Sequence, residues 1–263
     1  MSLSRADQIK QLLEDKEDIL ITFRKDVTGD AIGSAIALLL FFEKIGKNAE
    51  IVVDDFKLPK KFKFLDSVEK IQPQPNDLQN FIISLDIEGK GLKNISYDIQ
   101  GSDLKIYVSP QKGMVEPEDI NATNSKFKYY TVVTVDTQSL KSLGEFYEKN
   151  TSLFFDTPII NIDHSNNNEY YGHINFVDIT STSTVELVFN LLKELGEEYV
   201  EEDIATSLLT GLIDKTQSFK TENVSPQTLG VASELINLGA DRDNIVKNLF
   251  RTRSIKELKL WGQ

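Results

Sequence analysis

The sequence predicts an α/β protein: a mainly parallel sheet flanked by helices, with an antiparallel β insertion and a helical C-terminal part. Three observations predict this fold. Two apolar runs, residues 18–23 and 49–53, enclose a helical pattern that begins near Asp30, as in a right-handed βαβ unit. Residues 78–128 alternate between apolar and polar positions and contain turn signals. From residue 181 onward, apolar residues recur at helical spacing.

The N-terminal third begins the parallel sheet. A polar loop, residues 24–29, separates the first strand from the long helix, and Gly46-Lys47 ends that helix. The elements expected here are a helix at 7–13, a strand at 18–23, the helix from Asp30, a strand at 49–53, a short helix at 62–65 and a short strand at 68–71.

The rest of the chain first leaves the parallel pattern and then returns to it. Two near-continuous apolar runs after the insertion are typical of strands covered on both faces. The strands expected in the insertion are 81–85, 95–99 and 104–108, and those of the resumed sheet are 130–135 and 158–162. The helices expected after them are 184–195, 203–213, 227–238 and 242–250, with a further amphipathic helix beginning near Lys259.

Composition excludes several classes of function. The 263 residues contain no cysteine, which removes thiol nucleophiles, thiolate metal sites and disulfides, and which fits a reducing cytoplasm. The longest apolar run, residues 35–42, is too short to span a bilayer, so we expect a soluble protein without a membrane partner. A net charge of −12 argues against binding to duplex DNA, which requires lysine and arginine to neutralise phosphates.

Three aspartates and one histidine share a position at or just past the end of a predicted core element. Asp30 opens the first long helix, Asp136 and His164 follow predicted strands, and Asp214 follows the helix at 203–213. Ligand sites of open α/β sheets form outside the carboxyl ends of the strands. Carboxylates with one imidazole suit Mn²⁺ or Mg²⁺. Each aspartate alone is as well explained by a turn or a helix cap.

Taken together, four segments resemble motifs one to four of the DHH phosphoesterase family, which includes RecJ-like exonucleases and hydrolases of nanoRNA and phosphoadenosine phosphate. The segments are Thr28-Gly-Asp30-Ala-Ile-Gly-Ser34-Ala, Thr134-Val-Asp136-Thr, Asn161-Ile-Asp-His164-Ser and Gly211-Leu-Ile-Asp214. The resemblance extends from about Leu20 to Arg253. It implies a metal-dependent hydrolase of phosphodiesters or nucleotides.

The motifs also depart from the family pattern. Motif one usually carries a histidine and two aspartates, and here these places hold Arg24, Thr28 and Asp30. The second histidine of motif three is Ser165. Motif four, usually aspartate-threonine-glycine, reads Asp214-Lys215-Thr-Gln. The resemblance therefore implies one complete metal site, formed by Asp30, Asp136, His164 and Asp214, while the other site keeps only the bridging Asp136.

Three residues could act on a phosphate in place of the lost groups. Arg24 could contact the phosphate, or it could pair with the aspartates around the lost cation. Ser165 could donate a hydrogen bond but supplies no charge. Lys215 could restore a positive charge, although an ordinary surface lysine or an ion pair with Asp214 explains it better. We treat the other histidine, His173, as structural.

The leading hypothesis is a single DHH-type domain over 1–263 that has lost hydrolytic strength and keeps one divalent-cation and phosphate site. Its expected ligands are phosphate-containing small molecules, nucleotides or short single-stranded nucleic acid. The substrate domain that usually follows in this family has no counterpart in the sequence, and the chain could continue past Gln263 in the natural protein.

Two alternatives remain open. The chain could be a catalytically inactive binding or scaffolding module that acts through the insertion, where Tyr97, Tyr107 and Tyr129 are expected to be exposed. A strand edge there could pair with another chain, so we also consider a homodimer. A fully active phosphodiesterase with a one-metal mechanism is the remaining alternative.

Overall fold

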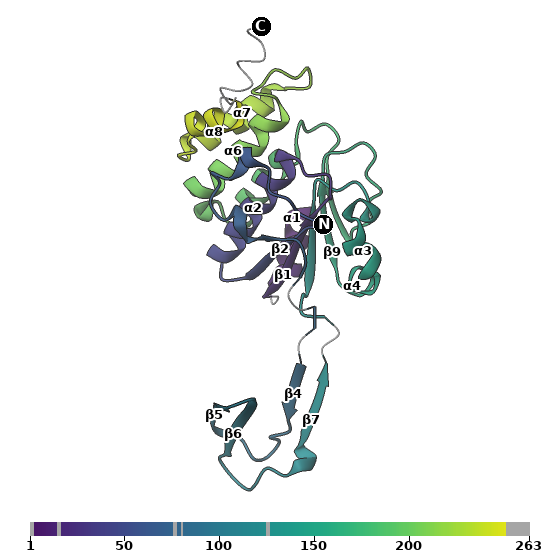
Figure 1. Cartoon of the computed structure of the whole chain (residues 1–263), viewed down its shortest axis with the longest axis vertical. Coiled ribbons are helices and arrows are strands. Elements are labelled where there is room, and N and C mark those ends of the chain that lie inside the picture. The colour runs from purple at the N-terminus through teal and green to yellow at the C-terminus, as the bar shows by residue number, and fades with distance from the viewer. Residues whose placement is uncertain (1–2, 15–16, 76–77, 80, 125–126, 251–263) are drawn as a thin grey trace. The chain divides into compact units, whose positions relative to one another are not determined.

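The computed structural model describes residues 3–14, 17–75, 78–79, 81–124 and 127–250. The chain forms two compact units (Figure 1). The first, here called the sheet unit, contains residues 1–76 and 129–263, and the second, the insertion unit, contains residues 77–128.

The sheet unit is built around six parallel strands in the order β10-β9-β8-β1-β2-β3. The central strands β1, β8 and β9 consist almost entirely of buried residues, because helices cover both faces of the sheet. The strands are β1 (Asp18–Phe23), β2 (Asn48–Val52), β3 (Ile71–Gln72), β8 (Thr131–Val135), β9 (Ile159–Asp163) and β10 (Ile174–Val177).

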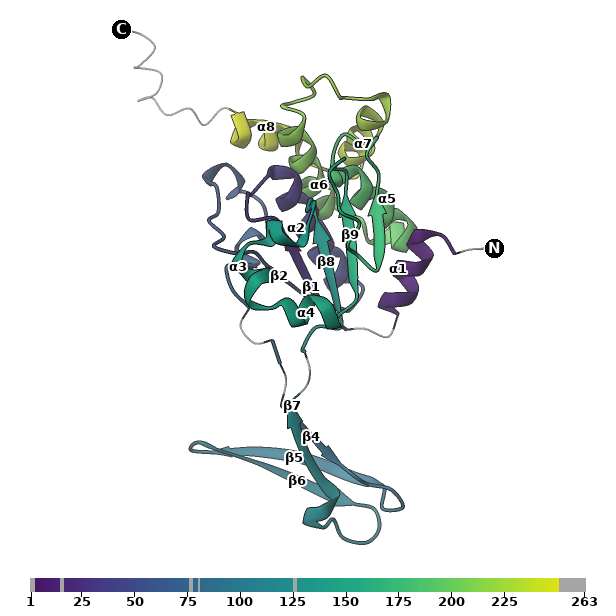
Figure 2. The ribbon, with the colours of Figure 1, turned by 90° about the vertical axis from the view of Figure 1, so that its right-hand side faces the viewer.

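Helices α1, α2 and α5 cover one face of this sheet, and the short helices α3 and α4 lie on the other (Figures 1 and 2). Helices α6, α7 and α8 form an outer layer over α2 and α5. The helices are α1 (Arg5–Leu13), α2 (Gly29–Lys44), α3 (Glu145–Lys149), α4 (Thr151–Asp156), α5 (Thr184–Gly196), α6 (Glu202–Lys215), α7 (Pro226–Asn237) and α8 (Arg242–Phe250).

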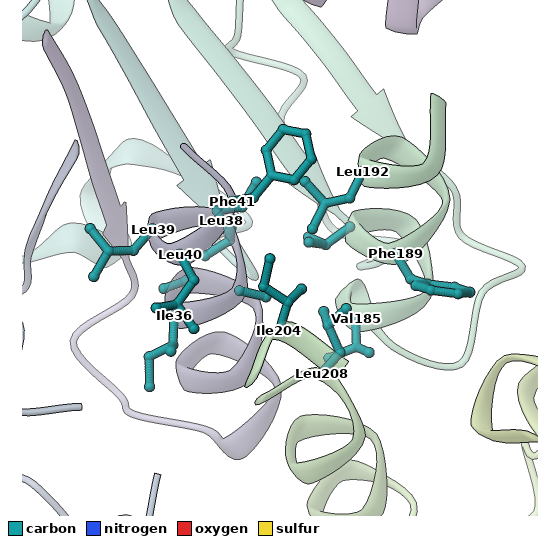
Figure 3. Close-up of a cluster of buried hydrophobic side chains, with 14 of the residues drawn as sticks. Ile36, Leu38, Leu39, Leu40, Phe41, Val185, Phe189, Leu192, Ile204 and Leu208 are labelled. Atoms are coloured by element: carbon teal, nitrogen blue, oxygen red, sulfur yellow. The ribbon is translucent and has the colours of Figure 1, made fainter. Parts of the chain in front are cut away.

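The centre of the core lies where α2, α5 and α6 meet. Phe41 of α2, Leu192 of α5 and Ile204 of α6 are buried and point toward one another (Figure 3). Helix α2 is apolar almost all the way around, because the sheet packs on one side of it and α6 on the other. Gly33 permits the second contact, since a Cβ atom there would lie 2.5 Å from the backbone oxygen of Ser207. This close packing brings the first turn of α2 beside the end of α6.

The insertion unit contains two antiparallel strand pairs. Strand β4 (Phe81–Leu85) pairs with β7 (Ile120–Asn124), and β5 (Leu92–Gln100) pairs with β6 (Asp103–Pro110) (Figure 2). A single 3₁₀ turn, Pro117–Asp119, precedes β7.

The fold class predicted from the sequence is confirmed, including the antiparallel insertion and the helical C-terminal part. The prediction missed β7, α3 and α4, which are short or lack a clear period. In place of the helix expected at 62–65 and the strand at 68–71, the chain forms two 3₁₀ turns, Lys60–Phe62 and Val68–Lys70, before the two-residue strand β3. The helix expected near Lys259 lies outside the described residues.

Two further expectations concern surfaces. Tyr97 and Tyr107 are exposed as predicted, but the prediction for Tyr129 was wrong. Tyr129 belongs to the sheet unit, where its ring is buried and its hydroxyl donates to Glu50 at 2.7 Å. Among the described helices, none has the length and apolar character needed to cross a membrane.

Candidate metal centre

The candidate site lies at the carboxyl end of the sheet, where the strand order reverses. From β1 the chain runs outward to β2 and β3 on one side, whereas β8, β9 and β10 extend to the other side. Loops that leave β1 and β8 therefore diverge at this point, which is where ligand sites of open α/β sheets form. Asp30 follows the loop after β1, Asp136 follows β8, and His164 follows β9, so three adjacent strands direct these side chains toward one place.

Asp30, Asp136 and His164 can each offer one ligand atom, and these atoms all lie within 4.8 Å of one another. The Nε2 atom of His164 is 3.5 Å from Oδ2 of Asp30 and 3.9 Å from Oδ1 of Asp136. Ligands that share one ion at about 2.1 Å lie no more than about 4.2 Å apart, so both separations fit a common cation. Two carboxylates and an imidazole also form a donor set that suits Mn²⁺ or Mg²⁺.

Asp30 is a fully buried carboxylate at the start of α2. Its two oxygens accept the backbone N–H groups of Thr184 at 3.0 Å and Val185 at 2.9 Å. These N–H groups belong to the first turn of α5, where a helix offers them no partner of its own. The ammonium of Lys215 lies 3.9 Å from Oδ2. Burial and the neighbouring Asp136 carboxylate nevertheless raise the pKa of Asp30 to about 8. The site therefore lacks enough positive charge to hold this carboxylate ionised at its usual pKa.

Asp136 offers its two carboxylate oxygens to different neighbours. Oδ1 faces His164, while Oδ2 accepts the hydroxyl of Thr28 at 2.6 Å. Thr28 also caps α2, because its hydroxyl accepts the N–H of Ala31 at 3.0 Å. The backbone of Asp136 has a φ of 46°, a left-handed conformation that is uncommon for residues other than glycine. Burial raises the pKa of Asp136 as well.

A network of polar side chains holds the turn that carries His164. Oδ1 of Asp163 accepts the N–H groups of His164 at 2.8 Å and Ser165 at 3.2 Å, while Oδ2 accepts the amide of Asn168 at 2.7 Å. Asn168 is in turn bonded to Asn161 of β9. Asp163 therefore positions the turn, which leaves the imidazole of His164 free to face Asp30 and Asp136. Burial and the positive charge of Lys215 lower the pKa of His164, which favours the neutral imidazole that a metal ligand requires.

Asp214, the fourth expected ligand, is held differently. It lies near the end of α6, and its side chain packs over Gly29, where any Cβ atom would collide with it. Its Oδ1 forms an ion pair with Lys61. The structure therefore places Asp214 next to the start of α2 but outside the group formed by Asp30, Asp136 and His164.

The candidate phosphate-binding residues occupy three different settings. Arg24 lies 3.9 Å from Asp26, and this exposed carboxylate, rather than Asp30 or Asp136, is its ion-pair partner within the described part of the chain. Ser165 accepts the N–H of Asn167 at 3.2 Å through its hydroxyl. Lys215, for which an ion pair with Asp214 was one alternative, lies 3.9 Å from Oδ2 of Asp30 instead, while Lys61 pairs with Asp214. For both Arg24 and Lys215, the alternative of an ion pair with the aspartates named above is therefore corrected, since Arg24 pairs with Asp26 and Lys215 with Asp30.

His173 has the structural role expected from the sequence, since its Nδ1 accepts the N–H of Ile159 at 3.1 Å. Sequence reasoning missed Lys61 and the two backbone donors of α5. Lys61 lies among several lysines, more than 150 residues away in sequence from its partner, and only the tertiary fold brings the two together. The run Ser181-Thr-Ser-Thr184 was a usable signal for a helix start, although it gave no indication that Asp30 would accept its N–H groups.

Comparison with known proteins gives this arrangement a family. A sequence model of the DHH family, N-terminal domain, matches residues 18–212. The bifunctional oligoribonuclease and PAP phosphatase NrnA of Thermus thermophilus is 28% identical over 250 residues, which cover 93% of this chain and 57% of that protein. The cyclic-di-AMP phosphodiesterase PdeA of Listeria monocytogenes is 23% identical over 96% of this chain and 34% of its own length.

A solved structure supports the same fold. The crystal structure of an exopolyphosphatase-related protein from Bacteroides fragilis superposes with a TM-score of 0.72 at 20% identity, covering 98% of this chain and 63% of the other. The present chain spans about half of NrnA and one third of PdeA. With a match over residues 18–212 and an acidic cluster at the carboxyl ends of adjacent parallel strands, the chain belongs to the DHH family.

Proposed function

We propose that this chain is a phosphoesterase-family domain that binds one divalent cation, Mn²⁺ or Mg²⁺, beside a phosphate of a nucleotide or short single-stranded oligonucleotide, and that it hydrolyses this ligand weakly or not at all. One observation carries the proposal. Asp30, Asp136 and His164 meet within 4.8 Å, while the remaining oxygen of Asp136 is already bonded to the hydroxyl of Thr28.

The meeting of Asp30, Asp136 and His164 supports cation binding. Burial raises the pKa of both carboxylates, and repulsion from Asp136 raises that of Asp30 further, so the ionised pair is unfavourable without a cation. A divalent cation would neutralise both and polarise a phosphoryl oxygen bound to it. Asp30, Asp136 and His164 would hold the ion, and Asp214 could join them after separating from Lys61. The neutral imidazole of His164 is ready to coordinate without first losing a proton.

The hydrogen bond from Thr28 to Asp136 supports weak hydrolysis. Hydrolysis with two metal ions needs ligands for both, so that one ion activates water while the pair clamps the transferring group. On the far side of Asp136, Thr28 offers a neutral hydroxyl where the family has an aspartate. Arg24, which stands where the family has a histidine, pairs with Asp26, and a guanidinium cannot acidify a water molecule. Lys215 and Lys61 can donate to a phosphate as point charges, which favours binding over turnover.

The ligand class is inferred from the relatives, which are named for activity on oligoribonucleotides, PAP and cyclic-di-AMP. Phosphate groups suit the two lysines at the site. An acidic net charge of −12 also favours a short ligand over a long polyanion.

Isothermal titration calorimetry tests the proposal on the full chain. We expect one Mn²⁺ per chain with micromolar affinity, and tighter binding of phosphoadenosine phosphate when Mn²⁺ is present. No Mn²⁺ or Mg²⁺ affinity better than millimolar would refute the cation site. A stoichiometry of two, together with rapid hydrolysis of a short oligonucleotide, would refute the loss of the second site.

A second function, that of a binding module acting through the insertion, is favoured by a separate observation. None of the residues 78–79, 81–123 and 127–128 is buried. A unit of this kind offers its apolar side chains to a partner rather than to its own core.

A further inference from the structure

The insertion unit presents an apolar face that its own residues do not cover. Every described side chain of this unit is at least partly exposed, and its two strand pairs form separate two-stranded sheets. A two-stranded sheet is only marginally stable in water and normally packs one face against another element. The observed pairing therefore calls for a cover over the apolar side chains.

Strand register gathers these side chains on one face of the β5–β6 pair. Ile95 lies opposite Val108, Tyr97 opposite Ile106, and Ile99 opposite Leu104, and directly opposed residues of antiparallel strands project to the same side. We call these six residues the hairpin face. Five of them, all but Val108, are between 44% and 73% exposed.

The reverse side of the same hairpin is polar. There, Ser96 lies opposite Tyr107, and Asp98 lies opposite Lys105. The hairpin is therefore amphipathic across its two faces, with alternating residues that are typical of a strand pair that is covered on one side only. The polar side can remain in contact with water, so the packing partner of this hairpin would lie on the hairpin face.

Charge limits what that cover can be. The hairpin face contains no ionisable group apart from the phenol of Tyr97, so it offers nothing to neutralise the phosphates of a nucleic acid or an anionic membrane. Residues 77–128 contain eight acidic residues and six lysines, a net charge of −2 out of the −12 of the whole chain. Two copies of this unit can therefore approach each other with little of the repulsion that opposes contact between two sheet units.

We propose that the hairpin face packs against the hairpin face of a second copy of this chain, forming a homodimer. The Tyr97–Ile106 pair is the middle of the three cross-strand pairs, so in a two-fold arrangement it lies at the centre of the interface and meets its own symmetry mate. An aromatic residue at the centre of an interface is a common source of binding energy. The two sheets would stack as in a β-sandwich, with both apolar faces inside.

The area is sufficient for such a dimer. Covering five exposed apolar side chains removes on the order of 100 Å² each from water, or about 1,000 Å² when both copies are added, which reaches the lower limit for a specific interface. We therefore expect reversible dimerisation in the micromolar range rather than an obligate dimer. The hairpin face belongs to the insertion unit, whereas the candidate metal centre belongs to the sheet unit.

Sedimentation equilibrium of the full chain tests this inference. We expect a concentration-dependent rise from the chain mass of 29.7 kDa to twice that value. Tyr97→Arg places a charge at the centre of the hairpin face and should weaken dimerisation at least ten-fold. Tyr107→Arg makes the same chemical change on the reverse side of the same hairpin and should leave dimerisation within two-fold of the wild type.

Hydrogen exchange provides a measurement that does not depend on the variants. Amides of β5 and β6 in the wild-type chain should become more protected as the protein concentration rises through the dimerisation range. A wild-type chain that stays monomeric at millimolar concentration would overturn the inference, as would equal loss of dimer in Tyr97→Arg and Tyr107→Arg. Mn²⁺ binding should be the same in both variants, so failure here and failure of the cation site are separate outcomes.

Discussion

The two sides of the Asp136 carboxylate differ in what surrounds them. Toward Oδ1 lies the imidazole of His164, which is also 3.5 Å from the buried carboxylate of Asp30. Toward Oδ2 lies the hydroxyl of Thr28, which donates at 2.6 Å and also caps α2. The first side concentrates negative charge and cation ligands, whereas the second satisfies its oxygen with a neutral donor.

Under the proposed function, this difference explains how the chain could bind one cation and not a second. A hydroxyl satisfies a buried carboxylate oxygen without any ion, so the Thr28 side is complete as it stands. The His164 side is less well neutralised. Within the described part of the chain, the basic side chains in ion-pair distance of Asp30 are His164 and Lys215, and Lys215 lies 3.9 Å away. We expect the consequences of this asymmetry to appear in four measurements.

The largest effect is expected when the shared carboxylate is removed. Asp136→Asn keeps an oxygen that can accept the Thr28 hydroxyl but removes the charge between Asp30 and His164. We expect Mn²⁺ affinity to fall at least about 100-fold, because the site loses one of its two carboxylate charges. Calorimetry measures this change. Unaltered affinity would place the cation somewhere other than beside Asp136.

The second measurement restores metal ligands on the side of Asp136 that faces Thr28. In the double variant Arg24→His with Thr28→Asp, the substituted residues supply the imidazole and carboxylate that the family resemblance implies. Aspartate also caps a helix as well as threonine does, so α2 should remain intact. We expect the Mn²⁺ stoichiometry to rise from one to two.

The matched control for this gain is Thr28→Asn. Asparagine can cap α2 but carries no charge, so its stoichiometry should stay at one. A double variant that folds and still binds a single ion would mean that the second side lacks more than these two residues.

The third effect concerns pH. The pKa of Asp30 is raised to about 8 in the folded chain, so between about pH 6.5 and 8 the folded state holds more protons than the unfolded state. Stability without metal should therefore fall as pH rises through this window. The lowered pKa of His164 acts below this range, where it has the opposite slope.

Thermal unfolding in EDTA measures this trend, and we expect a decrease of several degrees, since about 1 kcal/mol corresponds to roughly 2–4 °C in a chain of this size. Excess Mn²⁺ should reverse the slope, because the cation binds the ionised carboxylates. Asp136→Asn should flatten the slope in EDTA by removing the like charge that helps to raise the pKa of Asp30. A melting temperature that rises with pH in EDTA would contradict the assignment.

The smallest effect is expected from the lysine that engages Asp214. Lys61→Met removes the ion pair and frees Asp214 to join a bound cation, so Mn²⁺ affinity should increase about three- to ten-fold, the scale of a partly exposed ion pair plus one weakly gained ligand. Lys60→Met, which removes an equal charge from the neighbouring exposed position, is the control. Equal effects of the two variants would indicate general electrostatics rather than release of Asp214.

Much of the scaffold could be predicted from the sequence because its signals are local. The apolar runs of β1, β8 and β9 identify buried parallel strands, and the spacing of apolar residues in α8 gave the observed bounds of that helix. The expected grouping of Asp30, Asp136 and His164 followed from their shared place after core elements. Tyr129 was assigned to the wrong environment, since a tyrosine between the insertion and a strand carries no local sign of burial.

The pairing of charges at the site could not be predicted in the same way. Lys215 adjoins Asp214 in sequence, yet helical geometry points neighbouring side chains in different directions, so Lys215 reaches Asp30 and Lys61 reaches Asp214. The role of Asp163 depended on the turn conformation, which turned its carboxylate toward backbone N–H groups.

Periodicity and motif order are properties of the chain, so the sequence was enough to predict the main strands and helices, the family and the meeting of Asp30, Asp136 and His164. Tertiary structure alone decided that Asp30 accepts the first N–H groups of α5, that Thr28 occupies one oxygen of Asp136, and that Lys61 holds Asp214. Those contacts join residues far apart in the chain, and their energies depend on burial and distance, which only the folded arrangement fixes.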